Sequence, residues 1–467
     1  MNPHTASVVY VAVILALFWF DRERKVRTSR ALWIPTLWLL INGSRTVSAW
    51  LEPGRTVVEE ASQEGSPLDA AVFGILLLAA LCVLAWRRAR TVRFLRANAP
   101  ILLYFAYCAI SVLWADDSFV AFKRWTKAIG DLAVVLVVLT DPSPTAALRQ
   151  VLSRIAFILL PLSVLFDKYY PDIGRHYNVW TWLPSYGGVT VFKNLLGITC
   201  LVGSLGSVWS LTTAYRERKG RDRIFHMLPH AVILAVGIYL FLTADSMTSF
   251  SCFVFGGILI ALTTLKWVQR KPGAIHLLVV ALIALPLAAL FLPGTDMVQS
   301  LGRDASLTGR PRIWKAVIAV ADRPMTGAGF ESFWAGDRLS TIWRMIDERG
   351  IIEAHNGYLE VYLNLGWIGV TLLAVVIVNG YRNVITLFRR DQQAGSIRLA
   401  FFVVGIVFSF TEAGFRMMSL VWIAFLLSAT AVPLAQRRKE RLVMGGESRK
   451  PAWDAAGAAD KDALETV

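Results

Sequence analysis

The fold is decided by a stretch that reads Ala70-Ala-Val-Phe-Gly-Ile-Leu-Leu-Leu-Ala-Ala-Leu-Cys-Val-Leu-Ala-Trp86. It contains no charged residue, and a helix of about 17–25 apolar residues is long enough to cross the hydrocarbon core of a bilayer. Five basic residues follow directly in the segment 87–96. An apolar helix that leads into a cluster of arginines is typical of a membrane span that ends at a cytoplasmic loop.

Similar apolar runs recur from one end of the chain to the other. They predict an all-α polytopic membrane helix bundle of about 13 transmembrane helices, within a range of about 12–14, because the runs 32–50 and 399–413 are weak. The expected helices lie near residues 6–20, 32–50, 70–86, 98–114, 125–140, 150–166, 191–213, 225–244, 250–267, 275–293, 357–379, 399–413 and 417–435.

The composition agrees with a membrane protein. Of the 467 residues, 55% are hydrophobic and only 17% are charged, whereas soluble proteins carry about 25% charged residues. The net charge of +15 is spread over short clusters between the apolar runs, which excludes a nucleic-acid partner as its explanation. The four cysteines all fall inside apolar runs without metal-ligand spacing, so they predict packing residues.

The basic clusters predict the orientation of the bundle. The segments 21–30, 87–96 and 214–223 each hold five basic residues and are expected in the cytoplasm. One long loop, 294–356, then falls on the periplasmic side of a bacterial inner membrane, with amphipathic short helices such as 312–320. The expected parts are an N-terminal transmembrane bundle, the large periplasmic catalytic loop, C-terminal transmembrane helices and a disordered cytoplasmic tail, at 1–293, 294–356, 357–441 and 442–467.

Two parts of the large loop carry residues suited to chemistry. Arg310, Arg312 and Lys315 crowd near a glycine and a tryptophan, and guanidinium groups match phosphate oxygens with paired donors. A basic surface in contact with lipid headgroups is the alternative interpretation. His355 opens the next helix and can act as a general base, or simply cap that helix. Between them, Gly327 and Gly329 predict a tight turn or a close approach of backbones.

The order of these pieces resembles the O-antigen ligase and Wzy-type polysaccharide polymerase superfamily. The pieces are Gly309-Arg310-x-x-x-Trp314, Pro324-x-x-Gly327-x-Gly329, Ala354-His355-Asn356-x-Tyr358-Leu359 and Asn364-Leu-Gly366-Trp-Ile-Gly369. Further segments, 43–50, 65–69 and 188–197, are closer to the exopolysaccharide polymerases, although Ala70 and Phe192 depart from that branch's pattern.

The resemblance implies a membrane glycosyltransferase that polymerises exopolysaccharide repeat units carried on undecaprenyl diphosphate, with inversion and without a cofactor or metal. Its implied partners are the lipid-linked oligosaccharide and membrane lipid, with a chain-length regulator and export machinery as further candidates. In agreement, the one Asp-x-Asp triplet of the sequence, Asp460-Lys-Asp462, lies in the expected tail.

The chemistry of this reaction ranks the candidate residues. The leaving diphosphate needs positive charge, for which Arg310 is the first candidate, Arg175 the second and Lys193 the third. The acceptor hydroxyl needs a base, for which His355 is the first candidate and His176 the second. The remaining expected substrate-binding residues are Arg312, Asn356 and Glu412, and an ion pair at a helix end is the alternative for Glu412.

Two other functions remain open. An O-antigen ligase, which transfers the same lipid-linked glycan to lipid A core, shares the chemistry and the candidate residues. A transporter or flippase for that glycan would place ionisable residues along a central path and has no use for a large external loop with an arginine and a histidine.

Overall fold

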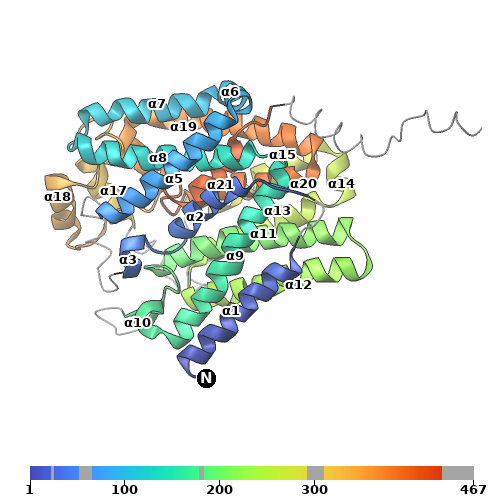
Figure 1. The fold of residues 1–467 in the computed structure, drawn as a ribbon. Coiled ribbons are helices and arrows are strands. Elements are labelled where there is room, and N and C mark those ends of the chain that lie inside the picture. Colours follow the sequence, from blue (N-terminus) through green and yellow to red (C-terminus); the bar gives the residue numbers. More distant parts are fainter. Residues whose placement is uncertain (23–25, 52–65, 178–183, 292–309, 434–467) are drawn as a thin grey trace, which may run out of the picture. The chain divides into compact units, whose positions relative to one another are not determined.

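The structure, a computed structural model, describes residues 1–22, 26–51, 66–177, 184–291 and 310–433. The expected tail and the first part of the large loop lie outside these residues. Internal contacts divide the chain into the unit Met1–Ala431 and the unit Val432–Val467, and the architecture below is that of the first unit. It is built from helices, and its one described sheet is a short antiparallel hairpin (Figure 1).

Six described helices are long and apolar enough to cross a membrane: α1 (Pro3–Phe20), α5 (Pro67–Trp86), α9 (Pro144–Tyr169), α11 (Lys193–Glu217), α12 (Gly220–Ala244) and α19 (Gly357–Arg390). The other main helices are α2 (Trp33–Asn42), α6 (Arg88–Ala97), α7 (Ala99–Ser111), α8 (Ser118–Leu139), α13 (Met247–Thr263), α15 (Pro272–Phe291), α17 (Arg310–Ala319), α18 (Gly336–Ile346), α20 (Gln392–Phe408) and α21 (Leu420–Ala429). The short elements are η1 (Arg30–Leu32), α3 (Val47–Leu51), η2 (Val112–Trp114), α10 (Pro171–Gly174), β1 (Arg175–Tyr177), β2 (Pro184–Tyr186) and α14 (Lys266–Arg270).

The all-α polytopic membrane fold predicted from the sequence is confirmed. Every expected apolar segment overlaps a helix. By length and hydropathy, however, six of the described helices are long and apolar enough to cross a membrane, or seven if α6 together with α7 and η2 forms one bent span. The number of about 13 spans therefore stays a prediction. The amphipathic helix expected at 312–320 is present as α17, whereas α6 and the β1–β2 hairpin were not predicted.

The segment 32–50 differs from the single helix that was expected. It is broken between α2 and α3, where the buried Arg45 donates from Nη2 to the carbonyl oxygens of Ile173 and Thr190. A guanidinium can lie in an apolar interior when carbonyl oxygens satisfy its donors. Arg45 therefore fastens the loop that carries the hairpin to the bundle.

Helix α11 lies against α9, α12 and α13 (Figure 1). Its contact with α9 is made through small residues: a Cβ atom added to Gly203 would meet Ala156 Cβ at 3.2 Å, and one added to Gly206 would meet Leu152 Cβ at 3.1 Å. Small residues let two membrane helices approach closely and gain packing contacts along their length.

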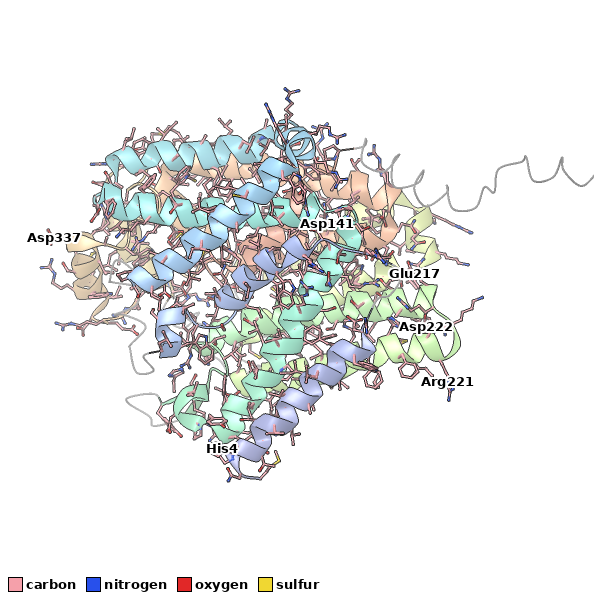
Figure 2. The ribbon with its side chains drawn as sticks, viewed as in Figure 1. His4, Asp141, Glu217, Arg221, Asp222 and Asp337 are labelled. Carbon is pink, nitrogen blue, oxygen red and sulfur yellow. The ribbon has the colours of Figure 1, made fainter. Side chains whose placement is uncertain are left out.

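The same helix connects two chemically different ends of the bundle. Helix α11 is 25 residues long, beginning at Lys193 and ending at Glu217. At about 1.5 Å per residue the two ends are about 37 Å apart, more than the hydrocarbon core of a bilayer. Glu217, Arg221 and Asp222 gather at the turn into α12, among the basic residues of 214–223 (Figure 2).

This geometry yields a labelling prediction. With Cys82 replaced by serine, a cysteine at Ser340 should react with an impermeant maleimide in outer-membrane-permeabilised cells, and a cysteine at Lys219 should react only after lysis. Both positions are exposed, whereas Ser332 in the same loop is buried and unsuitable. The reverse labelling pattern would overturn the orientation.

Two glycine-containing segments, the turn 324–329 and the break in α19 at Gly366, lie in direct backbone contact. The turn at 324–329 meets a break in α19 at Gly366, and the break is bridged by hydrogen bonds from Ala328 N to Leu363 O at 3.0 Å and from Trp367 N to Pro324 O at 2.9 Å. Gly366 has φ +63°, and a Cβ atom there would lie 2.2 Å from the carbonyl carbon of Met325. A Cβ atom added to Gly327 would lie 2.4 Å from the carbonyl carbon of Asn364, and one added to Gly329 would lie 2.7 Å from Ala115 Cα, so the close approach predicted for these two glycines is confirmed.

Gly366→Ala is therefore expected to lower the midpoint of thermal unfolding in detergent by several degrees, because both the left-handed φ and the backbone contact exclude a side chain. Gly336→Ala is the matched control, since Gly336 also has a positive φ, but a Cβ atom added to it would meet no other atom within 4 Å. An equally small decrease in the unfolding midpoint of both variants would contradict a stabilising backbone contact at Gly366.

Candidate active site

A pocket of about 420 Å³ lies between helices that are distant in the sequence. Its walls come from the starts of α11, α13 and α17, from the end of α18, and from the segments that precede α19 and α21. The lining residues that carry charge or can carry it are Lys193, Asp245, Arg310, Arg312, Glu348, His355 and Glu412.

Three helices begin at this pocket. Lys193, Met247 and Arg310 are the first described residues of α11, α13 and α17, and all three line it. The residues before α11 and α13 make no side-chain capping bond to these helices. Helix N-termini carry a partial positive charge and unpaired N–H groups, so their convergence beside basic side chains favours an anion.

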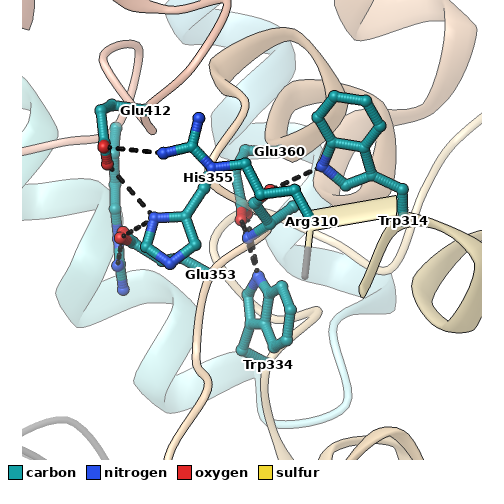
Figure 3. Close-up of polar contacts among 9 residues, drawn as sticks. Arg310, Trp314, Trp334, Glu353, His355, Glu360 and Glu412 are labelled. Atoms are coloured by element: carbon teal, nitrogen blue, oxygen red, sulfur yellow. Dashed lines mark hydrogen bonds and ion pairs between the residues drawn. The ribbon is translucent and has the colours of Figure 1, made fainter. Parts of the chain in front are cut away.

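Arg310, Glu412 and His355 form one connected chain at the pocket (Figure 3). Arg310 donates from Nη2 to Glu412 Oε1 at 3.1 Å. The other oxygen of Glu412, Oε2, lies 3.2 Å from His355 Nδ1, and Glu353 Oε1 lies 2.9 Å from the same nitrogen. His355 Nδ1 thus faces two carboxylates.

The two carboxylates decide the charge of the histidine. Burial alone would lower the pKa of His355, but the hydrogen bonds and charges of Glu353 and Glu412 outweigh it and raise the pKa to about 10. In return, although burial alone would raise the pKa of Glu353, its contact with His355 and the charges of Arg416 and Arg310 lower it. This pKa favours a protonated ring at neutral pH, whereas the general-base role expected from the sequence needs the neutral ring, and that role stays a prediction.

The backbone at His355 is held in an unusual conformation. His355 has φ +49°, and left-handed geometry in a residue other than glycine persists only where its surroundings impose it. Here the preceding Ala354 is fixed on both sides: Trp314 Nε1 donates to its carbonyl oxygen at 2.8 Å, and Glu360 accepts from its N–H (Figure 3). Trp334 in turn donates to Glu360 Oε2 at 2.9 Å.

The segment that carries Glu412 is anchored separately. Asn356 donates from Nδ2 to Phe410 O at 3.2 Å, and Asp131 in α8 accepts from Met418 N at 2.7 Å. Within this segment Arg416 lies 3.3 Å from Glu331 and 3.7 Å from Glu353. Contacts from α8 and from the loop before α19 therefore position the carboxylate next to the histidine.

The pocket brings together most of the residues expected from the sequence. Arg310, Lys193 and Arg312 line it with the two residues already described, His355 and Glu412. Lys193 also pairs with Asp245 at 3.4 Å, and Arg312 donates to Ile346 O at 2.9 Å, which ties α17 to α18.

Two expected substrate-binding residues have other contacts. Arg175 is not among the residues that line the pocket; it donates to Asp167 O at 2.7 Å and stacks on Tyr186 in the hairpin. Asn356 caps α19, accepting from Tyr358 N and Leu359 N at 3.0 Å each. His176, the second candidate base, lies in β1, also outside the pocket lining.

Sequence reasoning missed the partners that set the state of His355. Glu353 is two residues before His355, and no pattern in the sequence identifies it as the ion-pair partner of the imidazole ring. Glu360, Trp314 and Trp334 were likewise not assigned to the site, although Trp314 belongs to the same motif as Arg310. Their role is visible only once the chain folds back on itself.

Metal dependence can be tested directly. Glu353, His355 and Glu412 each offer one ligand atom, and these atoms lie within 4.8 Å of one another. A metal ion would have to displace the proton of His355 and sit beside Arg310, which opposes binding. Activity is therefore expected to survive EDTA, measured as product formed before and after chelation; full loss that magnesium or manganese restores would refute this.

The fold is that of a polytopic membrane protein, and its charged pocket lies at the starts of α11, α13 and α17. Comparison with known proteins shows which proteins the chain is similar to. Residues 230–374 match the model of a family described as O-antigen ligase. The chain is 25% identical over 291 residues to the exopolysaccharide production protein ExoQ of Rhizobium meliloti, covering 60% of this chain and 64% of ExoQ, which is less than two thirds of that protein.

A second relative comes from Rickettsia prowazekii and is named "putative polysaccharide ligase". It is 24% identical over 355 residues, covering 71% of this chain and 80% of the relative. These matches confirm the resemblance seen in the motifs: the chain is similar to proteins of the O-antigen ligase and Wzy-type family. The family match includes Arg310 and His355, whereas Lys193 and Glu412 lie outside it.

Proposed function

We propose that the protein is an inverting membrane glycosyltransferase that polymerises undecaprenyl-diphosphate-linked repeat units of an exopolysaccharide. The observation that carries the proposal is the meeting of Arg310 and His355 across Glu412 in one pocket. Catalysis of this transfer depends on holding the charge that grows on the leaving diphosphate, and fixed cations in a partly enclosed site do this well.

The donor's diphosphate would take the place of Glu412 beside Arg310. The guanidinium then turns its paired N–H groups to the phosphate oxygens, and Glu412 Oε1 loses its partner. Lys193 and the three helix starts supply further positive potential at the same wall. Binding of the donor thereby frees a carboxylate oxygen inside the pocket.

That oxygen is placed to accept the proton of the acceptor hydroxyl. The acceptor oxygen forms a bond to the anomeric carbon from the face opposite the diphosphate, the bond from carbon to the phosphate oxygen breaks, and undecaprenyl diphosphate leaves with the electron pair. The hydroxyl proton passes to Glu412, so the atoms and charges balance without an added reagent. Attack from the opposite face inverts the anomeric centre.

His355 then acts as a cation rather than as the base that the sequence suggested. Its Nδ1 is committed to Glu353 and Glu412, and the charged ring has a second N–H, on Nε2, to donate. An imidazolium next to Arg310 adds to the charge that stabilises the diphosphate as it leaves. Glu353 has the supporting task of keeping the ring protonated.

We place the pocket on the periplasmic side of the inner membrane. Lys193 lies at the pocket and the basic segment 214–223 at the other end of α11, and α19 likewise runs from the His355 segment to Arg389 and Arg390. Basic residues concentrate in cytoplasmic loops, so the opposite end of both helices faces outward.

The direct test uses purified protein and a defined undecaprenyl-diphosphate oligosaccharide as both donor and acceptor. Longer glycans that remain on the lipid carrier, with release of undecaprenyl diphosphate, are expected. Hydrolysis alone, or no product from folded protein, would contradict polymerisation.

An O-antigen ligase is the second candidate. The match to the Rickettsia prowazekii protein covers 80% of that protein, which is named as a putative polysaccharide ligase. The ligase would transfer the glycan to lipid A core instead of to a second carrier-linked unit. A deletion strain separates the two: loss of secreted polysaccharide with normal lipopolysaccharide supports the polymerase, and loss of long O-antigen on lipid A supports the ligase.

A further inference from the structure

A second hollow, of about 330 Å³, lies away from the pocket described above, between α5, α6 and α8. Its walls are apolar, with Leu84 from α5, Leu95 from α6, and Leu132 and Leu136 from α8. Among the residues that line it, Arg88 is the one that carries a charge. The hollow is therefore an apolar groove with a single cation.

Helix α6 gives this groove its shape. It meets α7 at an angle of 87°, and the bend is fixed by Asn98, whose Nδ2 donates to Phe94 O at 2.8 Å and whose Oδ1 accepts from Ala431 N at 2.7 Å. Phe94 is buried, and Leu95 faces the groove. A short basic amphipathic helix bent away from a membrane helix is typical of a segment that lies in the lipid headgroup region.

The arginines around this helix differ in what they contact. Arg87 forms an ion pair with Asp141 at 3.4 Å, and Arg90 donates to Thr140 O at 3.1 Å, so both are held by the protein. Arg88 and Arg96 are exposed, and neither has a hydrogen-bond or ion-pair partner within the described part of the chain. Of these four arginines, Arg88 alone combines an available guanidinium with a place on the groove.

We propose that this groove binds an anionic glycerophospholipid, with an acyl chain along the leucines and the phosphate on Arg88. The apolar walls match a hydrocarbon chain, and the guanidinium matches a phosphate that keeps a net negative charge. The setting also suits a lipid, because Trp86, at the end of α5 beside the groove, is 91% exposed and tryptophan is enriched at the headgroup level of membranes. A soluble anion would make no use of the leucine walls.

The experiment measures binding of phosphatidylglycerol to the full-length protein, purified in neutral detergent, by native mass spectrometry and by the shift in thermal midpoint. Phosphatidylglycerol is expected to bind and stabilise, and phosphatidylcholine to do so less. Arg88→Ala should weaken phosphatidylglycerol binding about fivefold, as expected for the loss of one cation near a headgroup. Ala85→Phe, which fills the groove, should weaken it as well.

Arg96→Ala is the matched control, because it removes a charge that is also exposed and lies on the same helix but outside the groove. It should keep most of the binding. Equal losses in Arg88→Ala and Arg96→Ala would overturn the proposal in favour of non-specific attraction to a basic surface. It would also be overturned by inorganic phosphate reproducing the stabilisation, or by equal binding of phosphatidylcholine.

Discussion

Replacing Arg310 by alanine should lower glycan polymerisation about a thousandfold while leaving the amount of protein in the membrane unchanged. Arg310 faces the pocket at the first described residue of α17 and has Glu412 as its partner at 3.1 Å. Removing it takes away the cation that the leaving diphosphate would contact, and a fixed group that stabilises developing charge is worth about 10²–10³ in rate. Arg310→Lys should recover little, because lysine keeps the charge but lacks the planar pair of donors.

Arg312→Ala is the control for this result. Arg312 lines the same pocket in the same helix, but its guanidinium is bound to Ile346 O, so its loss should cost less than about tenfold. Initial rates with the purified variants on the lipid-linked donor measure both effects. Near-normal activity of Arg310→Ala, or a larger loss in Arg312→Ala, would remove Arg310 from the centre of the proposal.

The second large effect is expected at His355. Because the pKa of His355 is raised to about 10, its ring is expected to be fully protonated at neutral pH, as the proposal requires. The protonated form is lost only as the pH rises through that value. The protonation of His355 should therefore cause no change in turnover from pH 7 to 9 and a fall in turnover above about pH 10. His355→Ala should reduce turnover about 10²–10³-fold at every pH below that limit and abolish the alkaline fall.

The pH profile also separates this role from general-base catalysis. A histidine that must be neutral would make the rate rise about tenfold per pH unit between pH 7 and 10, since the neutral fraction grows by that factor. Such a rise in the wild type, absent in His355→Ala, would restore the base role expected from the sequence. The unfolding midpoint of His355→Ala should be recorded beside the rates, because the change leaves Glu353 and Glu412 without their shared partner.

The membrane fold was predictable because it depends on long apolar runs, which the chain must bury in lipid wherever they occur. Interruptions were harder to foresee. The break at Arg45 depends on carbonyl oxygens of Ile173 and Thr190, more than a hundred residues away. Similarly, the segment 87–96 reads as a basic loop, and its helical form depends on burial of Phe94 and on the contact between Asn98 and Ala431.

The basic residues of the candidate site were predictable from the sequence, but the charge state of His355 was not. Arginine and histidine beside glycine motifs are visible in the sequence, and Arg310 and His355 do meet at the pocket. The charge state of His355 depends on Glu353, its near neighbour in the chain, and on Glu412, which lies 57 residues further along. Arg175 was also expected at the site; it does not line this pocket, because its hairpin holds it against Asp167 and Tyr186, and its role in substrate binding stays a prediction.

The position of Glu412 has a consequence for how the protein is made. Lys193, Arg310 and His355 leave the ribosome before Glu412, and α20 must also be synthesised before the segment at Glu412 can complete the pocket. A nascent or prematurely terminated chain thus carries Arg310 without its carboxylate partner, although His355 already has Glu353 and Lys193 already has Asp245. Under the proposed function, such a chain lacks the group that would receive the acceptor's proton, and we expect catalytic activity only after the segment at Glu412 has folded against the pocket.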